Sequence, residues 1–367
     1  MANLFIRTSL APYRVDIYNI LHDKLNCKMC FYWSSDSSQK FDEKGMKDQC
    51  HFVPYVLKGI KIGSSSRKIC TEIWKLLKEN NPNIVIVPEF QISTIQVLLY
   101  RFLFRKKFKV ISMCDDSFDM VTNDNDFTWI HKLARKLIVP FLDDLLLVDS
   151  RVVEWYRKKY KKGIWLPIIR NEKNEIPLYE KSLPLSTKYI QTFGLKEKKI
   201  LLYVGRFDPV KNLEVLLSAI NIAKEEFTTV FVGGGELELK LKTLAQHCNK
   251  EIIFAGHYTG DGVRAWYNVS DVFILSSKRE AFGAVTNEAL IAGNYSIISE
   301  HAGSACLITP SNGVVINPYD EYEIAQSIDE AMSRIDISSN KPLLKANKMP
   351  FAFDTILDDV ILTLKKL

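Results

Sequence analysis

Two loops in the second half of the chain hold residues suited to binding an anion beside a hydroxyl-rich group. The first loop, residues 205–212, follows an apolar run and leads into a helix-like segment, and it contains Arg206 and Lys211. Backbone N–H groups and the helix dipole favour an anion at such a position. Arg can hold a diphosphate through two parallel hydrogen bonds, and Lys adds a compact charge. From the residues alone, a diphosphate site and a solvated loop are equally well supported.

The second loop, residues 280–288, places two carboxylates about two helical turns apart. That separation is too long for an i,i+4 pair, so Glu280 and Glu288 would reach different parts of an extended ligand. Carboxylates accept hydrogen bonds from hydroxyls, which suits a sugar ring or a ribose. Gly283 lets backbone approach a phosphate closely. Either glutamate alone would be an ordinary surface residue, so the interpretation depends on the pair.

The elements that must position these loops alternate along the chain. Short apolar, β-branched runs are separated by amphipathic segments with a helical period, which predicts parallel sheets covered by helices. Ligands in such sheets bind beyond the carboxyl ends of the strands, where both loops lie. The alternation pauses at a polar stretch with two prolines and then resumes. The predicted domains are residues 1–170, a linker at 171–197, a second α/β domain at 198–345 and a terminal helix at 346–367.

The motifs together resemble the retaining family-4 glycosyltransferases (glycosyl transferases group 1) of bacterial surface-polysaccharide type. G-R-x-x-x-x-K-N follows a strand, and E-x-F-G-x-V-x-x-E-A-L-x-A-G comes later in the chain. The resemblance covers the second domain and includes a glycine loop at 233–235. Near the N-terminus, Pro12-Tyr13-Arg14 is similar to a loop in a subset of these transferases. The resemblance implies the GT-B architecture, two Rossmann-like domains facing an interdomain cleft, with the last helix packing back on the first domain.

The resemblance also implies roles for individual residues. Arg206 and Lys211 would hold the donor diphosphate and stabilise it as it leaves, while Glu280 would contact hydroxyls of the donor sugar, so these three are the expected catalytic residues. Glu288 would bind the nucleotide ribose. The other expected donor-binding residues are Gly205, Gly234, His257, Tyr258, Phe282, Gly283, Ala284 and Val285.

Candidate acceptor-side residues fall in two loops of the first domain. They are Pro12, Tyr13, Arg14, Asp115 and Asp116. Asp115 or Asp116 could orient an acceptor hydroxyl, and a role as helix caps or solvated acids is equally well supported. Many relatives carry two glycines in the first strand-to-helix loop, where this chain has residues 9–12 without glycine.

We expect no metal and no other cofactor, because retaining enzymes of this fold generally need none. The second domain has no Asp-x-Asp motif, and Asp124 and Asp126 form one only in a polar loop of the first domain, where we interpret them as solvated. No G-x-G-x-x-G follows the first strand, which disfavours an NAD-dependent enzyme. The alternatives are a sugar-nucleotide epimerase of the same fold, or a non-catalytic scaffold that binds sugar nucleotides or glycans.

The net charge is +6, and the excess of basic residues lies in the first half of the chain. Residues 101–109, 131–141 and 155–165 interleave Lys and Arg with aromatic and aliphatic side chains. Such segments can rest on an anionic membrane surface, which would suit a lipid-linked acceptor. Solvated helix faces are the simpler alternative, and a nucleic-acid partner is not expected.

Seven scattered cysteines, an odd number, indicate a reducing compartment, and Cys27-x-x-Cys30 reads as two small residues on a buried strand. No signal peptide and no membrane span are expected. The sequence therefore predicts a cytoplasmic retaining hexosyltransferase, with the cytoplasmic face of a membrane as its further expected position. It would move a sugar from a UDP- or GDP-sugar to a glycan or lipid-linked glycan in cell-surface polysaccharide synthesis.

Overall fold

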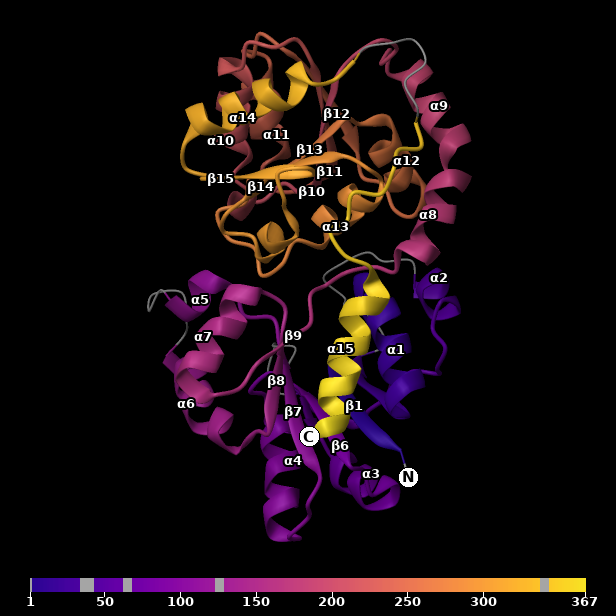
Figure 1. The fold of residues 1–367 in the computed structure, drawn as a ribbon, viewed down its shortest axis with the longest axis vertical. Helices are drawn as coiled ribbons and strands as arrows, with labels where there is room; N and C mark the ends of the chain where they lie inside the picture. The colour runs from indigo at the N-terminus through magenta and orange to yellow at the C-terminus, as the bar shows by residue number, and fades with distance from the viewer. Residues whose placement is uncertain (1, 34–42, 62–67, 123–128, 337–342) are drawn as a thin grey trace. The chain divides into compact units, whose positions relative to one another are not determined.

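The computed structural model describes residues 2–33, 43–61, 68–122, 129–336 and 343–367. The chain divides into two compact units (Figure 1). The first comprises Met1–Ile169 together with Phe353–Leu367, and the second comprises Arg170–Ala352. Each unit is built on its own parallel sheet with helices packed against it. The predicted α/β class with two Rossmann-like domains is confirmed.

The sheet of the first unit has, within the described residues, seven parallel strands in the order β3-β2-β1-β6-β7-β8-β9. Their bounds are β1 (Asn3–Ser9), β2 (Cys27–Trp33), β3 (Tyr55–Val56), β6 (Ile84–Pro88), β7 (Lys109–Cys114), β8 (Asp144–Leu147) and β9 (Ile164–Trp165). Every residue of β6 is buried, as expected for a strand covered on both faces. The direction of strand order reverses between β1 and β6, and such a reversal opens a crevice at the carboxyl ends of the two strands.

The remaining elements of the first unit surround this sheet. A small antiparallel pair is formed by β4 (Gly59–Lys61) and β5 (Lys68–Cys70). The helices are η1 (Pro12–Arg14), α1 (Val15–Leu25), α2 (Glu43–Asp48), α3 (Ile73–Asn80), α4 (Ile92–Leu103), α5 (Phe118–Thr122), α6 (Trp129–Ile138), η2 (Val139–Phe141), α7 (Ser150–Tyr160) and α15 (Phe353–Lys366). As the resemblance implies, α15 packs on the first unit, where it contacts α1 and β9 (Figure 1).

Among the described residues of the second unit, the sheet has six parallel strands in the order β12-β11-β10-β13-β14-β15, and this order reverses between β10 and β13. The strands are β10 (Ile200–Arg206), β11 (Thr228–Gly234), β12 (Glu251–Gly256), β13 (Val272–Leu275), β14 (Tyr295–Ser299) and β15 (Gly313–Ile316). The helices are α8 (Glu172–Lys181), α9 (Leu183–Thr192), η3 (Pro209–Lys211), α10 (Leu213–Ile222), α11 (Glu238–Ala245), α12 (Asp261–Val269), α13 (Ala284–Ile291), η4 (Gly303–Leu307) and α14 (Glu321–Ser333).

The segment predicted as a linker, residues 171–197, is largely helical and belongs to the second unit. The side chain of Asn171 caps α8 by accepting a hydrogen bond from the Lys173 amide at 3.0 Å. On α9, the ring of Tyr189 stacks on that of Trp266 with centroids 4.7 Å apart. Pro177, which lies inside α8, interrupts the helical pattern in the sequence.

The structure also bears on the cysteines, on Asp124 and Asp126, and on membrane spans. All seven cysteines lie in the described residues and none forms a disulfide. Cys27 and Cys30 are buried on β2, as predicted, and burial raises the pKa of both thiols to about 12. Asp124 and Asp126 lie outside the described residues. No helix in the described part of the chain is long and apolar enough to cross a membrane.

Candidate functional site

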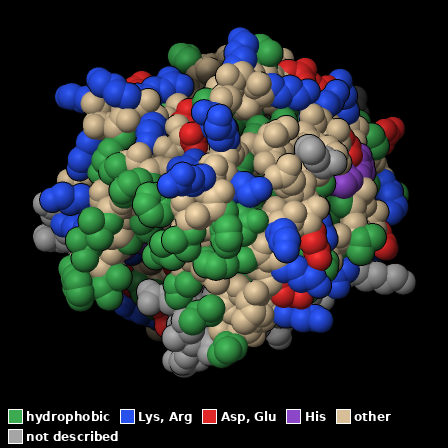
Figure 2. All heavy atoms as spheres, turned by 90° about the horizontal axis from the view of Figure 1, so that it is seen from below, with side chains coloured by type: hydrophobic (Ala, Val, Ile, Leu, Met, Phe, Trp, Pro, Cys, Tyr) green, Lys and Arg blue, Asp and Glu red, His purple; other side chains and the backbone are tan. Residues whose placement is uncertain are grey.

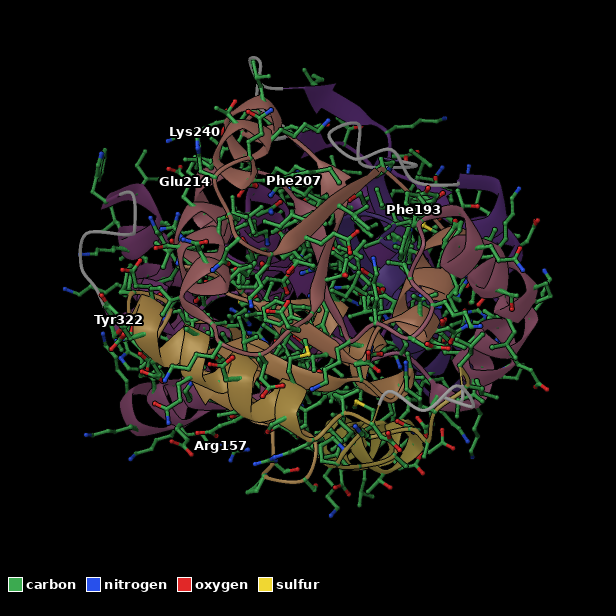
Figure 3. The ribbon with its side chains drawn as sticks, turned by 90° about the horizontal axis from the view of Figure 1, so that it is seen from above. Arg157, Phe193, Phe207, Glu214, Lys240 and Tyr322 are labelled. Carbon is green, nitrogen blue, oxygen red and sulfur yellow. The ribbon has the colours of Figure 1, made fainter. Side chains whose placement is uncertain are left out.

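The carboxyl ends of β10 and β11 are drawn together by glycines. Gly205 and Arg206 of β10 pair with Gly233 and Gly234 of β11. Gly233 has a φ of +141°, and a Cβ at this residue would lie 1.9 Å from the carbonyl oxygen of Gly205. Only glycine fits there without moving the backbone. Phe207, which directly follows β10, is buried, and its amide donates to the Gly234 carbonyl at 2.9 Å (Figure 3).

The two sequence motifs meet just beyond these strand ends. The ammonium of Lys211 in η3 forms an ion pair with the carboxylate of Glu280, which lies in the loop between β13 and α13. The Lys211 and Glu280 side chains are 13% and 21% exposed, so the pair is largely shielded from water. The loops are also joined by the backbone, because the Lys278 amide donates to the Val210 carbonyl at 2.8 Å. The site therefore lies at the point where strand order reverses in the second unit.

Arg206 lies at the same end of the sheet as Lys211, but its side chain is exposed to solvent. Its side chain is 70% exposed, and its guanidinium is 3.2 Å from the carboxylate of Asp208. An exposed ion pair of this kind contributes little to stability. The guanidinium is therefore available to an anion arriving from solvent.

The loop that carries Glu280 is clamped by η4 and its preceding residues. The Glu280 amide donates to the His301 carbonyl, and the Gly303 amide donates to the Glu280 carbonyl, each at 3.2 Å. Gly283 has a φ of +89°, and a Cβ there would lie 2.7 Å from Leu275. A larger residue is thus excluded from the turn that starts α13, whose first amides have no partner within the helix.

Glu288 lies about one turn into α13 and has its own surroundings. Its carboxylate accepts a hydrogen bond from the hydroxyl of Tyr267 at 3.1 Å. The hydroxyl of Tyr179 donates to the Glu288 backbone carbonyl at 3.0 Å. Burial raises the pKa of Glu288 above its usual value. Glu280 and Glu288 are not hydrogen-bonded to each other in the described residues, as the sequence spacing predicts.

The other predicted donor residues are placed as follows. Phe282 is buried and forms part of the clamped loop, and Ala284 and Val285 form the first turn of α13. His257 is exposed after β12. The ring of Tyr258 packs against those of Tyr189 and Trp266, with centroids 5.4 and 6.1 Å apart. Among the described residues, neither His257 nor Tyr258 hydrogen-bonds to the Lys211–Glu280 pair.

A second charged cluster lies in the first unit, at the carboxyl ends of β1 and β7. Asp115 accepts from the guanidinium of Arg7 at 2.8 Å and from that of Arg14 at 2.6 Å. Burial alone would raise the pKa of Asp115, but the charges of Arg14 and Arg7 lower it below its usual value. Arg14 is fully buried, and one of its terminal nitrogens, Nη1, has no hydrogen-bond partner among the residues that the structure describes. Of this cluster, Arg14 and Asp115 were predicted and Arg7 was missed.

Glu89 is a further residue that sequence reasoning missed. It directly follows β6, on the other side of the strand reversal, and it has a φ of +38°, which is uncommon for a residue with a side chain. Hydroxyls of Thr94 and Ser112 donate to its carbonyl at 3.1 and 2.8 Å and hold this conformation. Burial, with the nearby charge of Asp115, raises the pKa of Glu89 to about 7. The available signal was a single acid at the end of the apolar run Ile84–Pro88.

Asp116 differs from its neighbour. It is 2% exposed, accepts from the hydroxyl of Tyr156 at 2.7 Å, and lies 3.5 Å from the guanidinium of Arg135. Asp116 is therefore not a solvated surface acid, whereas the Asp115 side chain, paired with two arginines, is 31% exposed. Pro12 and Tyr13 form η1 with Arg14, and burial raises the pKa of Tyr13.

Across the described ranges, no group of three or more His, Cys, Asp or Glu residues is arranged to hold a metal ion. Metal independence itself stays a prediction.

The class of protein is defined first by the fold. HepE of Anabaena, solved in complex with UDP, aligns with a TM-score of 0.75 at 15% identity and covers 100% of both chains. The lipopolysaccharide outer core galactosyltransferase WaaB, in its apo form, aligns with a TM-score of 0.70 at 18% identity, again over 100% of both chains. The chain therefore has the GT-B fold.

The sequence comparisons identify the second unit more closely. Residues 186–341 match the family model described as Glycosyl transferases group 1. An uncharacterized glycosyltransferase of Methanocaldococcus jannaschii is 28% identical over 142 residues, 37% of this chain and 36% of its own length. Spore coat protein SA of Bacillus subtilis is 32% identical over 154 residues, 38% of this chain and 41% of its own. The matches thus span about two fifths of these relatives, and the chain carries a Glycosyl transferases group 1 domain that includes Lys211 and Glu280.

Proposed function

We propose that the protein is a metal-independent retaining glycosyltransferase of family 4. It would transfer a hexose from a UDP- or GDP-sugar to a glycan or lipid-linked glycan during cell-surface polysaccharide synthesis. The observation that carries the proposal is the shielded Lys211–Glu280 ion pair, placed at the strand reversal of a matched transferase domain with Arg206 beside it. HepE, which shares the fold, was also solved with UDP-glucose, which favours a uridine donor.

The proposed donor site uses charge that is already in place. A diphosphate entering beyond β10 would meet the exposed guanidinium of Arg206 and would share the ammonium of Lys211 with Glu280. As the sugar–phosphate bond breaks, negative charge grows on the leaving diphosphate, and cations positioned in advance lower that barrier. Glu280 would hold sugar hydroxyls, and the Glu288 carboxylate, oriented by Tyr267, would hold the ribose.

The proposed acceptor site is the charged cluster of the first unit. Glu89 and Asp115 lie at the ends of β6 and β7, beside β1, where an open α/β sheet binds its ligand. Arg7 and Arg14 keep Asp115 ionised, and Glu89 has a pKa near neutrality. Two carboxyl groups of different proton affinity suit the binding of a polyhydroxylated acceptor. A lipid-linked acceptor would place the protein on the cytoplasmic face of a membrane.

The experiment that tests the proposal is a donor screen in the presence of EDTA. UDP-, GDP-, dTDP- and CMP-sugars would be compared by thermal shift and by slow release of the nucleotide. We expect one donor to stabilise the protein and to be turned over by the wild type but not by Glu280→Gln. The matched control is Lys198→Ala, which breaks a Lys–Glu pair with Glu251 at the opposite end of the same sheet.

The outcomes separate the alternatives. NMR of the product would show an unchanged anomeric configuration if the enzyme is retaining. Donor binding with no turnover after acceptors have been supplied would favour the scaffold, and an isomerised sugar nucleotide would favour the epimerase. No stabilisation by any sugar nucleotide would refute the proposal.

A further inference from the structure

Helix α4 carries an apolar face that the rest of the first unit leaves exposed. Ile95, Leu99 and Phe102 recur at helical spacing, and Phe102 is 80% exposed. The opposite side of the helix buries Val97 and Tyr100 together with Ser93 and Thr94, whose hydroxyls hydrogen-bond to Tyr32 and to backbone carbonyls. Apolar side chains thus lie on both sides of α4, whereas a helix at a water-exposed surface keeps polar residues on its outer side. The exposed side of α4 is therefore suited to contact with apolar material.

Helix α6 and η2 extend this surface. Their exposed apolar side chains are Trp129, Ile130, Leu133, Leu137 and Phe141. A hollow of about 990 Å³, lined among others by Leu99, Phe102 and Phe141, joins them to α4. Seen from below the view of Figure 1, hydrophobic side chains gather in a patch bordered by Lys and Arg (Figure 2). We call the exposed apolar side chains of α4, α6 and η2 the α4/α6 face. A patch of this extent marks an interaction site.

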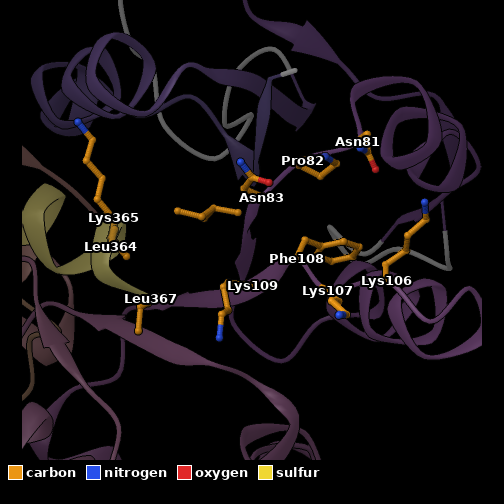
Figure 4. Close-up of a pocket in the computed structure, with 11 residues that line it drawn as sticks. Asn81, Pro82, Asn83, Lys106, Lys107, Phe108, Lys109, Leu364, Lys365 and Leu367 are labelled. Carbon is orange, nitrogen blue, oxygen red and sulfur yellow. The ribbon is translucent and has the colours of Figure 1, made fainter.

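The segments that carry the α4/α6 face hold only basic charges, although Arg101 is paired with Asp143 just beyond Phe141. Residues 92–107 and 129–141 contain no Asp or Glu. Lys106 and Lys107 follow α4 and, with Lys365 of α15, line a second hollow of about 410 Å³ (Figure 4). Lys106 lines both hollows, so the basic hollow adjoins the apolar face. Apolar side chains bordered by lysines fit a surface with an apolar interior beneath an anionic outer layer.

We propose that the α4/α6 face docks on an anionic lipid bilayer, with its aromatic side chains among the acyl chains and the lysines on lipid phosphates. A second copy of this chain fits less well, because a symmetric contact would bring lysine borders of the same sign together. Exposed Trp129, Phe102 and Phe141 are side-chain types that favour the membrane interface. The inference rests on the proposed membrane association but not on transfer chemistry.

The first test is flotation of the full chain with vesicles. Phosphatidylcholine vesicles would be compared with vesicles that also contain phosphatidylglycerol. We expect the wild type to float with the anionic vesicles at low salt and to bind them less at high salt, because exposed charges are screened. If the wild type stays with the unbound fraction on both vesicles at low salt, the docking proposal is wrong.

Variants then locate the surface. Phe102→Asp should lower partitioning by about tenfold or more, the effect of no longer burying one large apolar side chain. Leu239→Asp is the matched control, because Leu239 is 79% exposed but lies on α11 of the second unit. An equal loss in both variants would contradict the assignment. Unchanged thermal melting of Phe102→Asp excludes misfolding as the cause of a loss.

The lysines are tested separately. Lys106→Glu with Lys107→Glu should lower binding to anionic vesicles by about 30-fold or more, since each of the two basic residues near such a surface contributes about 1 kcal/mol. Lys188→Glu with Lys196→Glu, exposed in the second unit, is the control and should bind normally. Sedimentation tests whether a second copy of this chain covers the α4/α6 face instead. The proposal would be overturned if the wild type forms a dimer that Phe102→Asp dissociates and does not bind vesicles.

The docking proposal and the transferase proposal fail in different ways. A chain that a sugar nucleotide stabilises but that does not float would overturn docking alone. A chain that floats but that no sugar nucleotide stabilises would overturn the donor site alone.

Discussion

Lys211 and Glu280 are 69 residues apart in the chain, yet their side chains form the central contact of the candidate donor site. Each satisfies the other before a ligand arrives, which keeps a shielded charge in place without leaving it unpaired. Arg206 is instead exposed, so its guanidinium is free to follow the diphosphate as negative charge develops. In the proposed donor site the two cations would therefore have different tasks, although both would serve the same phosphate groups.

Replacing Arg206 with Ala should lower kcat by about 10²–10³, the usual loss when one group that stabilises transition-state charge is removed. Stability should change little, because the ion pair of Arg206 with Asp208 is exposed. Steady-state nucleotide release would measure kcat, with Arg334→Ala on the far side of the second unit as control. An unchanged kcat for Arg206→Ala would remove Arg206 from the catalytic set.

Glu89 makes stability depend on pH in a predictable direction. The pKa of Glu89 is about 7 in the folded chain, against an ordinary value of 4.5 for a glutamate side chain in the unfolded chain. Between pH 4.5 and pH 7 the folded state therefore binds more protons than the unfolded state. The contribution of Glu89 to stability is therefore greatest at low pH and is lost as pH rises towards 7. Glu89→Gln does not titrate, so relative to wild type it should gain on the order of 2 kcal/mol between pH 5 and pH 8.

Denaturant unfolding of both proteins at the two pH values would measure this difference. Glu197→Gln, at an exposed carboxylate in the second unit, should follow the wild type at both. If Glu89→Gln also follows the wild type, the Glu89 carboxyl has an ordinary pKa and its proposed role in acceptor binding loses its support.

At the scale of elements, the sequence predicted best where one local pattern was sufficient. The loops after β10 and β13 could be identified because motif residues directly follow apolar strands. Arg7 and Glu89 could not, because their meaning depends on β1 lying between β2 and β6, which no local pattern reveals. The segment 171–197 was misassigned for a related reason, since α8 and α9 are stabilised by long-range contacts with α12 and not by a regular apolar stripe.

Tyr189→Ala tests that correction. If α9 is an integral part of the second unit, losing the buried ring that stacks on Trp266 should cost about 3 kcal/mol in the free energy of unfolding. Lys188→Ala changes the neighbouring exposed residue of the same helix and should cost little. Chemical denaturation would compare the two variants. Equal stability of Tyr189→Ala and wild type would restore the interpretation of this segment as a linker.

At the scale of the whole molecule, charge is divided between the two units. The basic excess lies in the first half of the chain, where the α4/α6 face has a lysine border and no Asp or Glu in its segments. In the second unit, Arg206 and Lys211 lie at the end of one sheet. One unit is thus suited to an extended anionic surface and the other to a small, concentrated anion.

That division leads to a prediction about metal ions. If Arg206, Lys211 and the first amides of α13 supply the positive charge that a leaving diphosphate needs, transfer should proceed at the same rate in EDTA and in Mg²⁺. The measurement is sugar transfer by dialysed protein in both buffers, with Lys211→Ala run alongside. We expect Lys211→Ala to be slow in both, because a solution cation cannot replace a fixed ammonium. Activity that disappears in EDTA and returns with Mg²⁺ would show that a metal carries the charge we assign to these side chains.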